Sequence, residues 1–222
     1  YLMMAASPVL AITRTVIAAT LFNVPFSFAP IGKIKRIILL GVVMVIGFAI
    51  FNLPQVQRKM FYSGEGKLSE IAKDNEDFST TGRGAILDIL LDDVSDSPWV
   101  GHGTGAAETL TYAVSLVGYP HNDWLLTYFD YSILGVVIYF LSNVLMMIHC
   151  IRSARQSNES QTRLFFLAGA STFVPFMLVM FTDNIMVYAS FFGILQYLLI
   201  GLAYGALAAE RDAIKALRLR AM

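Results

Sequence analysis

One histidine of this sequence stands where it could act as a general base. His121 opens the run His121-Asn122-Asp123, in which Asn122 or Asp123 can cap a helix that follows. The positive end of the helix dipole disfavours an imidazolium, so the His121 ring is expected to be neutral, as a general base must be. The alternative interpretation is an interfacial histidine in an aromatic belt with Tyr119 and Trp124.

Two arginines are suited to hold phosphate oxygens. Arg83 begins a predicted helix, where backbone N–H groups and the dipole favour an anion and a guanidinium adds a forked donor. A solvated loop arginine bonded to Asp88 is the alternative. Arg14 lies within an apolar run, where an arginine is costly and normally faces a bundle interior or a wet cavity. Its alternatives are snorkelling or a structural ion pair with Asp130 or Asp183.

Two further segments could support such a site. The run Gly101-His102-Gly103-Thr104-Gly105 follows no predicted strand, so it does not fit a dinucleotide site. It is predicted to let the backbone approach a ligand or a neighbouring helix closely, with Gly103 and Gly105 as supporting positions. Asp183 lies in a predicted turn between the last two apolar runs, which could place a carboxylate at the mouth of a cavity. The single Cys150 rules out an internal disulfide and a cysteine-based metal cluster, and neither a metal nor a cofactor is predicted.

The elements that would position these residues are membrane helices. Apolar residues make up 56% of the 222 and charged residues 14%. In soluble domains about half of the residues are apolar and about a quarter are charged. Crossing a bilayer takes about 20 apolar residues in a helix. Five runs approach that length: roughly Met3–Phe28, then Ile37–Leu53, Tyr131–Ile151, Leu164–Phe181 and Ile185–Ala209. The sequence therefore predicts an all-α, polytopic membrane bundle of about five transmembrane helices, with a chain that begins inside the first of them.

The distribution of cations predicts the orientation. Ten of them lie in three short segments that alternating spans would place on one side: Lys33, Lys35, Arg36, Arg152, Arg155, Arg163, Arg211, Lys215, Arg218 and Arg220. The positive-inside rule makes that side cytoplasmic. Acids and bases balance at sixteen each, so bulk charge indicates no nucleic-acid partner.

Four parts follow from these spans. Residues 1–53 form two transmembrane helices, 54–120 an outer loop, 121–209 three transmembrane helices and 210–222 a basic cytoplasmic tail. The loop of 67 residues is far longer than a connector requires, and such loops are usually functional or disordered. Its first third, Gln55–Asp77, shows little periodicity. Helical spacing and caps within Thr81–Val117 predict two short helices lying over the outer membrane surface.

The order of the motifs is itself informative. They are Ile12-Thr13-Arg14-Thr15, Thr81-Gly82-Arg83, the stretch from Asp96-Ser97-Pro98-Trp99-Val100 into the glycine run, His121-Asn122-Asp123, and Tyr131-Ser132-Ile133-Leu134-Gly135. In this order and topology the chain resembles the O-antigen ligase and O-antigen polymerase superfamily, which includes exopolysaccharide polymerases. The resemblance covers nearly the whole chain but only the C-terminal half of a typical member.

The resemblance implies a bacterial inner-membrane glycosyltransferase of lipopolysaccharide or exopolysaccharide biosynthesis. Its donor would be a glycan on undecaprenyl diphosphate, and its acceptor lipid A–core in a ligase or another lipid-linked glycan in a polymerase. No nucleotide sugar, metal or cofactor would be needed. By position, His121 resembles the family's catalytic histidine, while Arg83 and Arg14 resemble the arginines assigned to the donor diphosphate. Members often have Ser-Arg where this chain has Thr13-Arg14, which makes the Arg14 match the weaker one.

Other functions remain open at this point. A protein O-oligosaccharyltransferase would use the same donor with a Ser or Thr acceptor. A transporter or channel would line its path with Arg14, Asp130 and Asp183, although the sequence shows no internal repeat and no paired broken helices. A third expectation is that the chain, lacking N-terminal spans, cannot close a complete donor groove alone. Ligase and polymerase are not distinguished by any short motif.

Overall fold

The computed structural model describes residues 27–28, 31–71, 75–77, 79, 83–114, 119–187 and 189–220. Within this part the chain folds into seven α-helices and one short 3-10 helix, without a strand, which confirms the all-α prediction there. The helices are α3 (Lys33–Phe51), α4 (Pro54–Met60), α5 (Arg83–Ser95), α6 (Ala106–Val114), α7 (Asp123–Gln156), α8 (Ser160–Val179) and α9 (Ala189–Arg220), with η1 at Leu68–Glu70. Arg14 and nearly all of the first predicted span lie outside the described residues.

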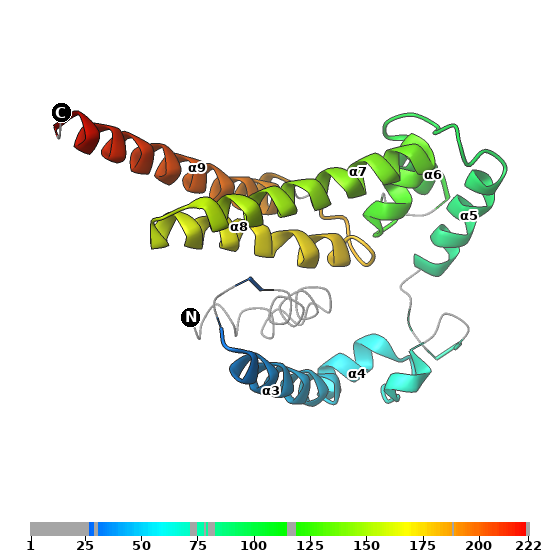
Figure 1. Ribbon diagram of the computed structural model, residues 1–222. Coiled ribbons are helices and arrows are strands. Elements are labelled where there is room, and N and C mark those ends of the chain that lie inside the picture. The colour runs from blue at the N-terminus through cyan, green and yellow to red at the C-terminus, as the bar shows by residue number, and fades with distance from the viewer. Residues whose placement is uncertain are drawn as a thin grey trace.

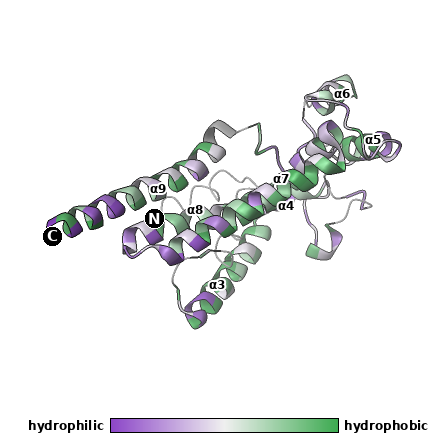
Figure 2. Ribbon diagram, turned by 45° about the horizontal axis from the view of Figure 1, so that its top comes forward, coloured by the Kyte–Doolittle hydropathy of each residue, from purple (hydrophilic) through white to green (hydrophobic). Residues whose placement is uncertain are grey.

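Three described helices, α3, α7 and α8, are long and apolar enough to cross a membrane. They correspond to the second, third and fourth predicted spans. Figure 2 shows that apolar residues cover most of α3, whose N-terminal end is polar. No residue of α3 is buried, so its apolar side chains face outward, as those of a helix in lipid do. The structure therefore supports several membrane spans in the described part of the chain.

The helices α7, α8 and α9 lie side by side as a bundle, with α8 packed against both of the others (Figure 1). Their shared core is apolar and consists of Cys150, Ala154, Phe166, Ala170, Phe173, Met177, Ile200 and Ala203. Gly169 of α8 meets Ile200 of α9, where an added Cβ would lie 3.0 Å from the isoleucine side chain. The small residue lets the two helices approach closely, as is usual in membrane bundles.

The last helix, α9, covers the fifth predicted span from Ala189 onward and continues to Arg220. Residues 210–220, predicted as a tail, are therefore a helical extension. Glu210 ties this extension to the α7–α8 turn, because its carboxylate accepts the Asn158 N–H and the Ser157 hydroxyl, both at 2.9 Å. These hydrogen bonds, the Asn158 N–H first, lower the pKa of Glu210 below its ordinary value.

The two helices predicted over the outer surface are present as α5 and α6. They pack on the first two turns of α7 in Figure 1, and the buried side chains of this contact are Ile86, Leu90, Val94, Ala107, Leu125 and Phe129. The spacing of the three α5 residues is that of one helix face, which explains why the periodicity predicted the helix. The apolar residues at helical spacing that predicted this helix were Ile86, Ile89, Leu90 and Val94, and of these Ile89 alone is exposed, at 39%.

The start of the outer loop is more ordered than its sequence pattern predicted. Pro54 occupies the first turn of α4, where its missing N–H costs nothing and its φ suits a helix. Val56, Met60 and Phe61 form a small buried cluster against the end of α3. The helix has only seven residues, too few for a recognisable periodicity, and it is stabilised by this cluster.

A break divides α7 into an outer and an inner part. Ser132 has φ 68° and ψ −179°, a conformation that is rare for a residue other than glycine. The outer part, Asp123–Tyr131, precedes the break and carries the packing surface for α5 and α6. The helix is capped by Asn122, one of the two caps that the sequence predicted, whereas the uncharged run starts only at Tyr131, next to the break.

Candidate functional site

His121 lies one residue before the N-cap of α7. Asn122 is the cap, since its side-chain oxygen accepts the Leu125 N–H at 3.0 Å. His121 itself adopts a left-handed backbone conformation, with φ 51°, between the buried Pro120 and this cap. Non-glycine residues held in such conformations concentrate at functional sites. The structure therefore places the imidazole at the positive end of a helix, as the sequence predicted.

Asp183 is the acidic neighbour of His121. Its Oδ1 atom lies 3.5 Å from His121 Nδ1, and the two side chains are 27% and 25% exposed. The same oxygen accepts the Asn184 N–H at 2.9 Å, which fixes the carboxylate within the α8–α9 turn. A proton on Nδ1 facing Asp183 leaves Nε2 with its lone pair for a substrate. Within the described part of the chain, no group of three His, Cys, Asp or Glu residues could hold a metal ion.

Asp123 holds together the two segments that carry His121 and Asp183. Its side chain is fully buried, its N–H donates to the Met180 carbonyl at 2.8 Å, and its Oδ2 accepts the Met186 N–H at 2.8 Å. The first residue of α7 is thus bonded to both sides of the α8–α9 turn. Asp123 was predicted as a supporting residue, and the contacts assign it a positioning role in the fold.

Trp124 provides a second connection between the same segments. The indole N–H donates to the Met177 carbonyl of α8 at 2.8 Å, and the ring lies 5.8 Å from that of Phe181. The residue that the sequence placed in an interfacial aromatic belt therefore also anchors the start of α7 to the end of α8. Hydrogen bonds and ring packing together restrict the relative movement of His121 and Asp183.

The glycine run lies across the break in α7. Since Ser132 interrupts the helix, the Phe129 and Asp130 carbonyls accept the N–H groups of His102 and Gly103, both at 3.0 Å. A Cβ on Gly101 would lie 2.3 Å from the Asp130 carbonyl oxygen, so only glycine allows this approach. The close contact predicted for this run is therefore made with a neighbouring helix.

Asp130 fixes the far end of the same run. Its buried carboxylate accepts the Gly105 N–H at 2.7 Å through Oδ2 and the Ala107 N–H at 2.9 Å through Oδ1. These are the N–H groups at the start of α6, so the carboxylate also lies at the positive end of that helix. Gly103 and Gly105 have φ values of 96° and 81°, which bend the run around Asp130.

His102 is a residue whose contacts the sequence did not predict. Its ring stacks on that of Phe129 with the centroids 4.2 Å apart, and its Nε2 lies 3.3 Å from Asp93 of α5. It thereby connects α5, the glycine run and α7. Its position between two glycines was the available signal, but neither partner could be predicted from local spacing, since Phe129 is 27 residues away and Asp93 lies on the helix α5.

Arg83 is the first residue of α5, and its backbone alone is described. It precedes Ile86 and Leu90 on the same helix face by one and two turns. That face packs against Leu125 and Phe129, which lie four and eight residues after His121. The arrangement brings α5 to the α7 segment that begins beside His121. The Arg83 side chain and the whole of Arg14 lie outside the described residues, so their convergence with His121 stays a prediction.

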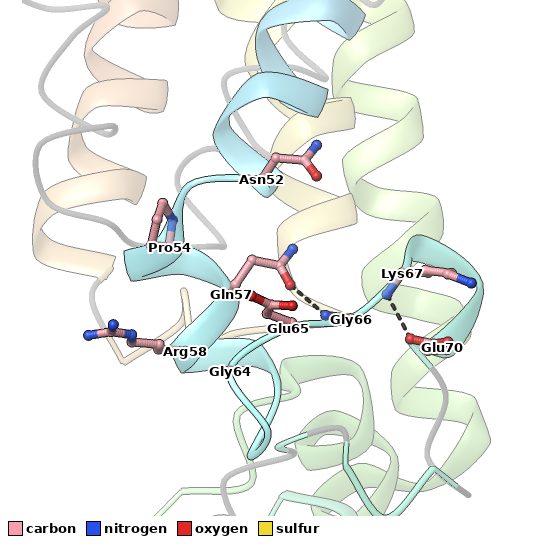
Figure 3. Close-up of a pocket in the computed structure, with 9 residues that line it drawn as sticks. All are labelled: Asn52, Pro54, Gln57, Arg58, Gly64, Glu65, Gly66, Lys67 and Glu70. Carbon is pink, nitrogen blue, oxygen red and sulfur yellow. Dashed lines mark hydrogen bonds between the residues drawn. The ribbon is translucent and has the colours of Figure 1, made fainter.

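A polar pocket lies apart from these residues, at the end of α3. It has a volume of about 650 Å³ and is lined by Asn52, Pro54, Gln57, Arg58, Gly64, Glu65, Gly66, Lys67 and Glu70. Figure 3 shows Gln57 bonded to the Gly66 N–H, at 2.7 Å, on one wall of this pocket. Neither His121 nor Asp183 contributes to it.

Comparison with known families supports the interpretation of the motifs. The family model described as O-antigen ligase matches residues 1–140. That range holds every motif on which the resemblance rested. Comparison with curated proteins gives no match. Since the family model covers more than half of the 222 residues, the chain belongs to the O-antigen ligase family.

Proposed function

We propose that this protein transfers a glycan from undecaprenyl diphosphate to a hydroxyl of an acceptor glycan, at the outer surface of the bacterial cytoplasmic membrane. Family membership implies a lipid-linked glycan transferase. The observation that supports a catalytic role most directly is His121, held before the α7 N-terminus with Asp183 at 3.5 Å. A base oriented by a carboxylate is the arrangement that activates hydroxyl nucleophiles in many enzymes.

In the proposed reaction, neutral His121 accepts the proton of the acceptor hydroxyl through Nε2. The hydroxyl oxygen forms a bond to the anomeric carbon of the donor, while the bond from that carbon to the diphosphate oxygen breaks. Asp183 stabilises the imidazolium that results. Direct displacement from the opposite face inverts the anomeric configuration. Such a base contributes typically about 10²–10⁴-fold to the rate.

Arg83 and Arg14 complete the proposal by binding the diphosphate. The leaving group gains negative charge as the bond breaks, and guanidinium forks that are already in place stabilise that charge without reorganisation. Support for Arg83 comes from its place at the start of α5, whose buried face packs beside the α7 segment that follows His121. Arg14 is proposed from the resemblance of its motif.

His121→Ala tests the proposal. In the whole protein, reconstituted with a lipid-linked glycan donor and its acceptor, we expect transfer to be abolished while donor binding persists. The matched control is His149→Ala, which removes an exposed histidine that contacts Tyr204 near the other end of α7. Undiminished product from the His121 variant would exclude it as the base. Loss of donor binding as well would assign His121 to binding.

A further inference from the structure

A second cavity lies between the end of α7 and the start of α8. Its volume is about 400 Å³, and its lining residues are Phe28, Ile151, Ala154, Arg155, Arg163 and Leu167. We call it the arginine groove. Two of the six lining residues are cations, four are apolar and none is acidic. It lies toward the opposite ends of α7 and α8 from His121 and Asp183.

The order of side chains along the two helices gives the arginine groove a polar end and an apolar end. On α7, Ile151 lies one turn before Arg155, and on α8, Leu167 lies one turn after Arg163. Because α7 and α8 are both candidate spans, the turn joining them lies at a membrane surface. The guanidiniums therefore stand near the surface, and the aliphatic side chains stand one turn deeper on each helix.

The walls of the arginine groove are held in place by hydrogen bonds. Arg163 Nη2 donates to the Ser157 carbonyl at 3.2 Å, which directs one guanidinium along the turn. The Phe28 N–H donates to the Ser171 hydroxyl of α8 at 2.8 Å, which keeps the Phe28 backbone against α8. The Glu210 carboxylate, near the same turn, accepts hydrogen bonds from the Ser157 hydroxyl and the Asn158 N–H. Among the described residues, no carboxylate forms an ion pair with Arg155.

We propose that the arginine groove binds an anionic phospholipid. The phosphodiester would lie between Arg155 and Arg163, which can donate forked hydrogen bonds to its oxygens. One acyl chain would lie along Ile151, Leu167 and the Phe28 ring. Basic pockets between membrane helices commonly hold anionic headgroups in this way. Inorganic phosphate would leave the apolar walls uncovered, so a lipid fits the whole groove better.

Native mass spectrometry of the whole purified protein, with equimolar phosphatidylglycerol and phosphatidylethanolamine, tests this inference. We expect the wild type to retain phosphatidylglycerol preferentially. Each arginine near a membrane surface contributes about 1 kcal/mol to binding an anionic lipid, so Arg155→Gln should weaken binding about fivefold and R155Q/R163Q about 25-fold. Arg155→Gln alone keeps the test valid if loss of the Arg163 hydrogen bond to Ser157 disturbs folding.

The control variant R152Q/R218Q removes the same charge from two exposed arginines that do not line the arginine groove. We expect it to retain phosphatidylglycerol. R155K/R163K, which preserves the charge but lacks the forked donors, should bind the lipid more weakly than the wild type and more tightly than R155Q/R163Q. An equal loss from both glutamine double variants would show a general surface effect and overturn the inference. Displacement of the lipid by inorganic phosphate at constant ionic strength would indicate a phosphate site instead. Because glycan transfer is not a readout, the result is independent of the proposed function.

Discussion

Single side chains at the candidate site differ in how firmly they are held. The separation of 3.5 Å between His121 Nδ1 and Asp183 Oδ1 is at the long end for a hydrogen bond, whereas Asp183 accepts the Asn184 N–H at 2.9 Å. The carboxylate is therefore fixed by its own turn and acts on the imidazole mainly through charge and orientation. Catalytic contacts of this kind often shorten when substrate binds.

Asp183→Asn should lower the turnover number without changing the fold. The amide oxygen can still accept the Asn184 N–H, so the turn is preserved, but the negative charge facing His121 is lost. We expect kcat to fall about tenfold, a part of what a general base contributes, with the KM for donor unchanged. Steady-state transfer assays measure both values. A raised KM with constant kcat would contradict the assigned role.

Arg83→Lys should impair donor use although it preserves the charge. An ammonium cannot replace the two parallel hydrogen bonds that a guanidinium offers to phosphate oxygens. We expect weaker donor binding and slower transfer. Arg58→Lys is the control, because Arg58 lines the pocket at the end of α3 and not the candidate site. Wild-type transfer by the Arg83 variant would remove this residue from the diphosphate site.

At the scale of elements, the outer helices are attached to α7 by a buried carboxylate and by a partly exposed histidine. Asp130 accepts two N–H groups at the start of α6, and His102 lies between Phe129 and Asp93. Apolar side chains of α5 cover the same part of α7. The outer part of α7 is thus a platform on which the loop is assembled, and the loop's shape depends on it.

Asp130→Ala should destabilise the attachment of α6. The carboxylate is 4% exposed, and its loss leaves the Gly105 and Ala107 N–H groups without an acceptor in the protein. Hydrogen bonds to a charged group contribute about 1.5–3 kcal/mol each, so the loss of two should be roughly 3–6 kcal/mol. Thermal unfolding in detergent should show a lower midpoint. Asp92→Ala, at an exposed position of α5, should change stability by less than about 0.5 kcal/mol.

Helical spacing and cap residues predicted α5 and α6, and the length of the apolar runs predicted the long helices. Periodicity did not predict α4, because seven residues beginning at Pro54 are too few for a pattern and their cluster forms against α3. It also did not predict the break at Ser132. Serine has no intrinsic preference for φ 68°, and the conformation is supported by hydrogen bonds to residues 98–103.

The candidate site was predicted in its parts but not in its contacts. His121 and Asn122 are adjacent to a helix start, so local rules identified a base and a cap. Asp183 was predicted only as a carboxylate near a cavity, because its proximity to His121 depends on how α8 packs beside α7. Asp123 was predicted to support the site. Its hydrogen bonds to the backbone of Met180 and Met186 show that it does so by joining the start of α7 to the α8–α9 turn.

At the scale of the whole molecule, the proposed reaction requires the loop to lie on the outer side of the cytoplasmic membrane. Lipid-linked donors with their glycans face that side, and the cationic turns predict the opposite side to be cytoplasmic. The candidate site and the arginine groove would then lie at different leaflets. The orientation follows from the charges and stays a prediction.

Cysteine labelling tests the orientation cleanly, because the single native Cys150 is fully buried. Tyr62→Cys places a thiol at an exposed position of the outer loop, and Leu219→Cys places one near the end of α9. In intact cells, a membrane-impermeant maleimide should label the first variant and not the second. Permeabilised cells should show both labelled. The reverse labelling pattern would place the loop in the cytoplasm and contradict the proposed function.

The contact between the glycine run and the break in α7 has a consequence for biosynthesis. Residues 98–107 leave the ribosome before Phe129, Asp130 and Ile133, the partners that their backbone needs. The outer loop therefore cannot complete its fold until the third span has been synthesised. His121 can contact Asp183 only after about 60 further residues have been made. A nascent chain arrested between the two would expose that unfinished surface to proteases, so the time order of translation sets when this region becomes resistant.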